Sequence, residues 1–258
     1  YFQWARRQSR HLRNRHRPSL AHVLILFHIL TMTKIIDHRQ VKLRGRAAMT
    51  NPAVRFDSVR SEHVDDGWDR GADLPVLRTT VSIEVPRRVI SKNTSPDLSF
   101  DRSINPYRGC EHGCIYCFAR PSHAYLGLSP GLDFETRLIA RPDAPVILEK
   151  ELRNPRYIPA MIAIGTNTDP YQPIEKDHEI MRGILKVLAK FNHPVGIVTK
   201  GAMIERDIDI LAPMAAKGLV RVGISITTLD NKTSRAMEPR VPLPARRLQT
   251  IRRLTDAG

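Results

Sequence analysis

The chain has 258 residues, of which 41% are apolar and 26% charged, enough for a hydrophobic core in one large domain or two small ones. Its formal net charge of +15 is uneven, because residues 1–50 hold eleven Lys or Arg and one acid, Asp37, so that the other 208 residues carry only +5. A nucleic-acid-binding face clusters positive charge on the folded domain, so charge alone supports nucleic-acid binding only weakly.

The first segment, residues 1–41, is a basic leader that we expect to be either non-native or disordered, since the chain starts at Tyr1 and Met32 or Met49 are alternative starts. Its apolar run at residues 21–32 is shorter than the ~20 residues that span a bilayer. No small-residue cleavage site follows that run. We therefore expect no membrane association.

Residues 42–95 form an extension of mixed composition, which we expect to pack on a core rather than to form one. It contains two short strand candidates, Thr79–Glu84 and Arg87–Ile90. The core itself is predicted to span residues 96–258.

Short apolar runs in the second half of the chain predict buried parallel strands at Met161–Gly165, Val195–Thr199 and Leu219–Ile226. Helical periods lie between and after them. The first comprises Ile180, Ile184, Val187, Leu188 and Phe191, the second Ile204, Ile208, Leu211 and Ala215, and the last Leu248, Ile251 and Leu254 within a helix at 244–257. This alternation predicts an α/β fold built from βαβ units.

Polar side chains follow the strands: residues 166–169 (TNTD), Thr199 with Lys200, and Ser225. In α/β barrels the active site lies at the carboxyl ends of the strands, which favours a binding site there. Ordinary turn and helix-cap chemistry is the alternative for any single position. Asp169, Glu238 and Arg240 also lie near strand ends, and no role is assigned to them.

The three cysteines of the chain, Cys110, Cys114 and Cys117, lie within eight residues with the spacing C-x3-C-x2-C. An odd number of cysteines, so closely spaced, argues against a disulfide framework and favours a cytoplasmic protein. Thiolates suit iron–sulfur clusters and zinc. A closed electron-transfer cluster has four protein ligands, so three favour a cluster with one iron open to a ligand. Gly109 and Gly113 would let the loop wrap closely.

A zinc site is the main alternative for the cysteines. His112 or His123 would complete a Cys3His set, a normal composition for structural zinc. Zinc ribbons, however, pair two ligand couples across a loop, whereas here the cysteines are crowded together. A zinc-stabilised nucleic-acid-binding module is the corresponding non-enzyme hypothesis.

The cysteine motif with Tyr116 before its last cysteine resembles the signature of the radical SAM superfamily. The wider sequences at residues 105–120 (NPYRGCEHGCIYCFAR) and 44–56 (RGRAAMTNPAVRF) resemble the spore photoproduct lyase-like branch. The resemblance runs from about residue 42 to the end. It implies a partial (β/α)6 TIM-like barrel with the cluster after its first strand and an irregular N-terminal extension.

The resemblance also implies a [4Fe-4S] cluster on the three cysteines and reductive cleavage of S-adenosylmethionine to a 5′-deoxyadenosyl radical, chemistry that belongs to the cofactor. By position, Thr166 and Lys200 are expected to contact the methionine portion and Ser225 the ribose, with Tyr116 also at the cofactor. No catalytic residue is assigned. An electron donor such as flavodoxin or ferredoxin is implied.

Two departures separate the chain from a true photoproduct lyase. That enzyme relies on a further cysteine near residues 164–166, which here read Ile-Gly-Thr, and it has a tyrosine where this chain has Phe118. The substrate is therefore unassigned, with nucleic acid preferred. The chain ends after the fourth β/α unit, so we expect a truncated barrel, with a non-catalytic fragment as the alternative.

Overall fold

The computed structural model describes residues 45–54 and 78–258. Every described residue lies within one compact unit, Lys42–Gly258. The basic leader and its apolar run therefore lie outside the described residues.

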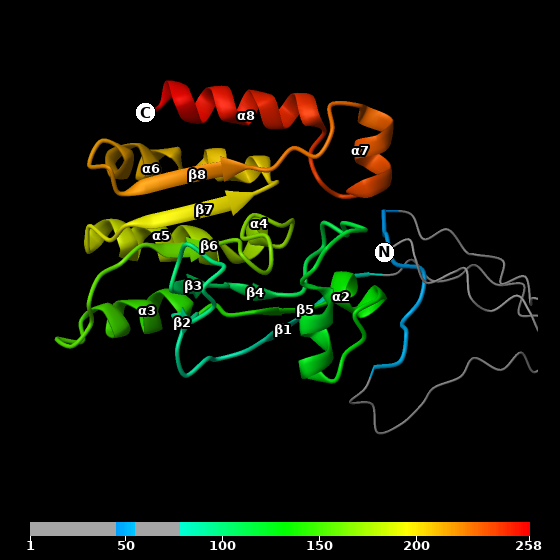
Figure 1. The fold of residues 1–258 in the computed structure, drawn as a ribbon, viewed down its shortest axis with the longest axis horizontal. Helices are drawn as coiled ribbons and strands as arrows, with labels where there is room; N and C mark the ends of the chain where they lie inside the picture. The colour runs from blue at the N-terminus through cyan, green and yellow to red at the C-terminus, as the bar shows by residue number, and fades with distance from the viewer. Residues whose placement is uncertain (1–44, 55–77) are drawn as a thin grey trace, which may run out of the picture. The chain divides into compact units, whose positions relative to one another are not determined.

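The main sheet has five strands in the order β2-β3-β6-β7-β8 (Figure 1). Its four longer strands, from β3 to β8, run parallel, and β2 is antiparallel to β3. The strands are β2 Ser91–Lys92, β3 Arg102–Ile104, β6 Ile162–Ile164, β7 Val195–Thr199 and β8 Val220–Ile224. The three predicted parallel strands are confirmed, and β3 is one that the apolar pattern missed.

A second sheet joins the extension to the cysteine region, in the order β1-β5-β4. Its strands are β1 Thr80–Ile83, β4 Tyr107–Arg108 and β5 Arg137–Ala140. The strand predicted at Thr79–Glu84 is thus confirmed as β1. The strand predicted at Arg87–Ile90 is wrong, because the N–H groups of Val89 and Ile90 donate to the Glu151 carboxylate, and pairing with β3 starts only at Ser91.

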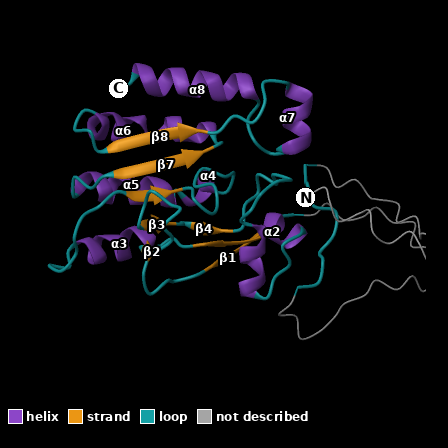
Figure 2. Cartoon of the chain, in the orientation of Figure 1, coloured by secondary structure: helices purple, strands orange, loops and turns teal. Residues whose placement is uncertain are grey.

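Helices alternate with the parallel strands (Figure 2), so the predicted βαβ organisation is confirmed. Helix α3 packs against α5, and α5 against α6. None of the described helices has the length and apolar character to cross a membrane. The helices are η1 Arg120–Leu126, α2 Leu132–Thr136, α3 Ala144–Leu152, α4 Glu175–His178, α5 Ile180–Lys190, η2 Ala202–Asp207, α6 Ile208–Ala215, α7 Asn231–Met237 and α8 Pro244–Asp256.

The buried face of α5 follows its predicted period. Ile180, Ile184 and Leu188 are at most 2% exposed and join Ile162 and Ile197 of the sheet in the main core. Burying one such side chain contributes about 1.5–3 kcal/mol, so this face fixes the helix on the sheet. The predicted second helix is instead split, with the 3-10 turn η2 preceding α6.

The last helix forms where it was predicted, but its buried face is only partly the predicted one. Leu254 packs on the main core as expected, whereas Leu248 and Ile251 are exposed by 43% and 37% and Arg247 and Thr250 are fully buried. The apolar period was wrong for Leu248 and Ile251 because Arg247 finds buried hydrogen-bond acceptors along its whole length. Such a pairing cannot be recognised from apolar spacing.

Helix α8 is tied to η2 through Glu205, whose carboxylate accepts hydrogen bonds from Arg246, Thr250 and Arg253. Burial acts to raise the pKa of Glu205, but these donors outweigh it and lower the pKa from 4.5 to about 2. A carboxylate with a depressed folded-state pKa stabilises the fold above its unfolded pKa, and this contribution is lost as pH falls from about 4.5 to about 2.

Replacing Glu205 by glutamine is therefore expected to lower the free energy of unfolding by about 1–2 kcal/mol at neutral pH, after allowance for solvent screening. Most of that difference should vanish near pH 2.5, where the wild-type carboxylate has lost most of its stabilising contribution. Urea denaturation of both proteins at the two pH values measures it. A difference that is the same at both would contradict the assigned role of the ionised carboxylate.

Candidate functional site

The three cysteines lie in the loop that follows β3 and the short strand β4. Cys110 and Cys114 are buried, Cys117 is partly exposed, and none forms a disulfide. All three line one pocket at the carboxyl ends of β6, β7 and β8. Its other lining residues are His112, Tyr116, Phe118, Gly165, Asn167, Thr168, Asp169, Val198, Thr199, Lys200 and Ser225.

Two glycines shape this loop. Gly109 and Gly113 have φ angles of +73° and +65°, in the left-handed region that glycine adopts without strain. A Cβ on Gly109 would lie 2.6 Å from Leu138 Cδ2, and one on Gly113 would lie 2.9 Å from Glu135 Oε2. The glycines therefore let the loop turn tightly and also pack closely on α2 and β5.

Gln172, fully buried after β6, holds the backbone on both sides of Cys110. Its Nε2 donates to the Gly109 carbonyl at 3.1 Å, and its Oε1 accepts from the Glu111 N–H at 2.9 Å. The Cys110 N–H itself donates to the Phe134 carbonyl at 2.9 Å. The two peptide groups that flank Cys110 are thus fixed, which sets the position of the first cysteine.

Asp169 connects the cysteine loop to the end of β7. Its carboxylate accepts from the Thr199 hydroxyl at 2.5 Å and from the Lys200 N–H at 2.7 Å. His112 Nδ1 lies 3.4 Å from Asp169 Oδ2. Burial acts to lower the pKa of His112, yet the facing carboxylate raises it to about 10. Burial acts to raise the pKa of Asp169, and His112 lowers it to about 2, so the pair is ionic.

Two thiols of the loop, those of Cys114 and Cys117, have raised pKa values. Burial raises the pKa of Cys114 to about 12, and burial also raises the pKa of Cys117. Because only the thiolate ligates metals, metal binding here would release protons and would be favoured as pH rises.

Tyr116 also lines the pocket, and its hydroxyl donates to the buried carboxylate of Glu238. Burial, followed by this hydrogen bond, raises the pKa of the tyrosine above its ordinary value. The ammonium of Lys200 lies 5.7 Å from the centre of the Tyr116 ring, a cation–π distance. Tyr116 and Lys200 are therefore brought together from the cysteine loop and the end of β7.

Three of the four predicted cofactor-binding residues line the pocket, and the fourth does not. Tyr116, Lys200 and Ser225 line the pocket together with the cysteines. Thr166 is not among the described lining residues, although its neighbours Gly165 and Asn167 are. Sequence reasoning missed Gln172 altogether, and for Asp169 and Glu238 the position near a strand end was the only signal.

The histidines considered for zinc have different surroundings. His123 is fully buried, donates from Nε2 to the Arg137 carbonyl at 3.0 Å, and packs edge-on against Phe134. His112 lines the pocket but faces Asp169. Among the described residues, no group of three or more His, Cys, Asp or Glu side chains is arranged to hold a single metal ion.

Replacing Gln172 by leucine, which has a similar volume, is expected to lower the iron retained per chain several-fold. The substitution leaves the buried Gly109 carbonyl and Glu111 N–H without partners, at a cost of about 1–3 kcal/mol each, and so frees the loop around Cys110. Iron content after anaerobic reconstitution and gel filtration is the measurement. Iron retention equal to that of the wild type would show that the hydrogen bonds of Gln172 do not hold the cysteine loop in place.

A family profile described as "Radical SAM superfamily" matches residues 104–258. An uncharacterised protein of Mycobacterium tuberculosis is 40% identical over 161 residues, which are 62% of this chain and 47% of that protein. An uncharacterised protein of Methanocaldococcus jannaschii is 26% identical over 155 residues, 60% of this chain and 55% of that protein. The chain thus spans about half the length of these relatives.

Among solved structures, the fold is similar to spore photoproduct lyase. The complex with dinucleoside spore photoproduct superposes with a TM-score of 0.51 at 18% identity, covering 71% of this chain and 50% of that one. A variant with bound AdoMet and dinucleoside spore photoproduct gives a TM-score of 0.51 at 17% identity, covering 71% and 50%. At this identity the similarity concerns the fold.

Proposed function

Since the chain belongs to the radical SAM superfamily, we propose that it is a [4Fe-4S] enzyme that cleaves S-adenosylmethionine reductively. Cys110, Cys114 and Cys117 would hold the cluster. When bound and reduced, the cluster supplies the electron that breaks the sulfonium bond to give methionine and a 5′-deoxyadenosyl radical. The prediction that the barrel is truncated after its fourth unit stays a prediction.

The donor set fits such a cluster. Three free thiols from one loop face one pocket, and soft thiolate ligands are those that iron–sulfur clusters take. The observation that carries the proposal is that the same pocket contains Lys200 and Ser225, from the ends of two successive parallel strands. The cluster ligands and the groups suited to a polar cofactor therefore line the same pocket.

The protein's own residues would then bind and orient the cofactor. The Lys200 ammonium is suited to the methionine carboxylate, and Thr166, two residues after β6, would serve the same portion of the cofactor. The Ser225 hydroxyl is suited to a ribose hydroxyl, and the Tyr116 ring to the adenosine. Gln172 and Asp169 would hold the loop and the Lys200 backbone in place.

The test is to reduce the anaerobically reconstituted protein with dithionite in the presence of S-adenosylmethionine and to quantify the products by chromatography. We expect methionine and 5′-deoxyadenosine in equal amounts, and neither without reductant. A fully loaded protein that forms no 5′-deoxyadenosine would contradict the proposed function.

For the substrate we propose a nucleic acid, with flavodoxin or ferredoxin as the electron donor in a reducing cytoplasm. The support is the similarity of the fold to a lyase that was solved with a dinucleoside. A single-stranded oligonucleotide is expected to accelerate 5′-deoxyadenosine formation. An unchanged rate across oligonucleotides of varied sequence would contradict the proposal for the substrate and leave the cleavage reaction standing.

A further inference from the structure

A fully buried guanidinium lies behind the wall of the cysteine pocket. Arg247 of α8 has no exposed side-chain surface, and neither has its partner Glu238, 2.5 Å away. Arg247 also donates to the Ser225 carbonyl at 2.8 Å, to the Pro242 carbonyl at 2.9 Å and to the Ser234 hydroxyl at 3.0 Å. The planar fork of arginine suits such a divergent set of acceptors.

This buried pair is an inefficient way to stabilise a fold. Removing two charges from water costs several kcal/mol per ion, and apolar replacements of similar volume often stabilise a protein as well or better. Where such pairs have a use, it is to specify one arrangement of the groups around them. The groups that Arg247 and Glu238 hold therefore indicate what the pair does.

Each residue of the pair forms a hydrogen bond with a residue that lines the pocket. Glu238 accepts the hydroxyl of Tyr116 with one oxygen and Arg247 with the other. Arg247 in turn donates a hydrogen bond to the carbonyl of Ser225. Tyr116 comes from the cysteine loop and Ser225 from the end of β8, so the pair spans two elements that both line the pocket.

The segment around Glu238 is also joined directly to the cysteine loop. The Ile115 N–H donates to the Met237 carbonyl at 3.0 Å, and the Arg240 N–H donates to the His112 carbonyl at 3.3 Å. Arg240 additionally forms an ion pair with Glu111 at 3.2 Å. A displacement of Glu238 would therefore move the Tyr116 side of the loop.

We propose that Glu238 and Arg247 are positioning residues that set the nucleoside half of the S-adenosylmethionine site, by fixing the Tyr116 ring and the Ser225 backbone relative to each other. This inference rests on the proposed function. Its influence on the methionine half is weaker, because Asp169 accepts from the backbone N–H of Lys200 and the pair reaches the Lys200 ammonium through the ring of Tyr116. The two halves of the cofactor should consequently respond differently to substitution.

The test uses 5′-deoxyadenosine and methionine as separate probes, with dissociation constants measured by anaerobic equilibrium dialysis against the cluster-loaded full chain. Arg247→Met removes all four hydrogen bonds of the guanidinium and is expected to weaken 5′-deoxyadenosine binding by about tenfold, the equivalent of one hydrogen bond lost at the nucleoside. Methionine binding should stay within about twofold of wild type. Neither measurement depends on turnover.

Two further variants keep the test decisive. Tyr116→Phe retains the ring and removes the hydroxyl that bonds to Glu238, and it should weaken nucleoside binding alone even if Arg247→Met folds poorly. Arg246→Met, the matched control, removes the neighbouring arginine of α8 that contacts Glu205 and not the pocket, and it should change neither constant.

The outcomes separate the two proposals. Nucleoside binding unchanged in both Tyr116→Phe and Arg247→Met, or an equal loss for both probes, would overturn the positioning role while the cleavage function stands. A wild-type protein that binds neither probe would overturn the proposed function and this inference with it.

Discussion

Substituting Cys114 with alanine is expected to reduce iron incorporation from roughly four irons per chain to background. Two thiolates cannot replace three in a loop where Gln172 and the glycines fix the backbone. Cys114 is buried in the pocket wall, and removing one sulfur there should cost about 1 kcal/mol of stability. Iron analysis after anaerobic reconstitution, together with circular dichroism, measures both effects.

The control for this prediction is His123→Gln. Glutamine retains a side-chain N–H that can donate to the Arg137 carbonyl, as His123 Nε2 does. If the cysteines hold the cluster alone, this variant keeps its iron. A Cys114→Ala protein with full iron would contradict the assignment, and a His123→Gln protein that loses its metal would favour a Cys3His site.

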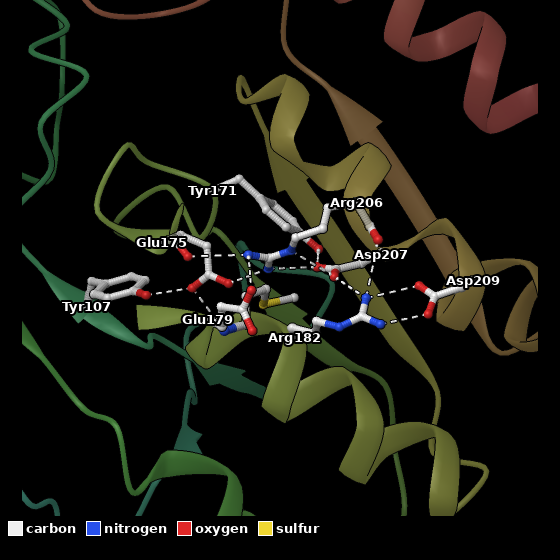
Figure 3. Close-up of polar contacts among 9 residues, drawn as sticks. Tyr107, Tyr171, Glu175, Glu179, Arg182, Arg206, Asp207 and Asp209 are labelled. Atoms are coloured by element: carbon white, nitrogen blue, oxygen red, sulfur yellow. Dashed lines mark hydrogen bonds and ion pairs between the residues drawn. The ribbon is translucent and has the colours of Figure 1, made fainter. Parts of the chain in front are cut away.

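Replacing Arg206 by methionine is expected to lower the free energy of unfolding by about 2–4 kcal/mol, the loss that follows when one partner of a largely buried ion pair is removed. Arg206 lies 2.6 Å from Glu175 and 3.1 Å from Asp207, and both carboxylates are fully buried. Figure 3 shows the three residues at the centre of a polar network that also reaches Tyr107 and Tyr171.

This network is connected to the backbone segments that carry Cys110 and Gln172. The Tyr107 hydroxyl donates to Glu175 at 2.5 Å, and Tyr107 lies three residues before Cys110. The Tyr171 hydroxyl donates to Asp207 at 3.1 Å, and Tyr171 precedes Gln172. Arg206→Met should therefore also loosen the cysteine loop, which would appear as lower iron retention.

Urea denaturation of the cluster-free protein measures the stability change, and Arg153→Met is the matched control. Arg153 pairs with Glu149 on the surface of α3, with 61% of its side chain exposed, so its loss should cost at most about 1 kcal/mol. Equal losses for the two variants would show that the buried network contributes no more than a surface ion pair.

The sequence predicted the elements that depend on local apolar pattern. Strand β7 matches its predicted bounds because Val195–Thr199 is a short run rich in β-branched residues. The cysteine loop and its glycines were also recognised, since thiolates at this spacing have few other uses. In each case the information lies within a few residues along the chain.

The polar framework of the site could not be predicted in the same way. Gln172 bonds to Gly109 across 63 residues, and Glu238 to Tyr116 across 122. Which polar side chain becomes buried depends on the acceptors that distant segments bring to it. Arg247 illustrates the consequence, because a charged residue occupies the inward face of α8 where the apolar period favoured Leu248 and Ile251.

The most direct test of the central claim is electron paramagnetic resonance of the reduced, anaerobically reconstituted protein with and without S-adenosylmethionine. We expect roughly four irons per chain and a reduced-cluster signal that shifts when S-adenosylmethionine is added, because an iron with only three cysteines available to its cluster is open to that ligand. Zinc in place of iron, or a signal indifferent to S-adenosylmethionine, would contradict the account.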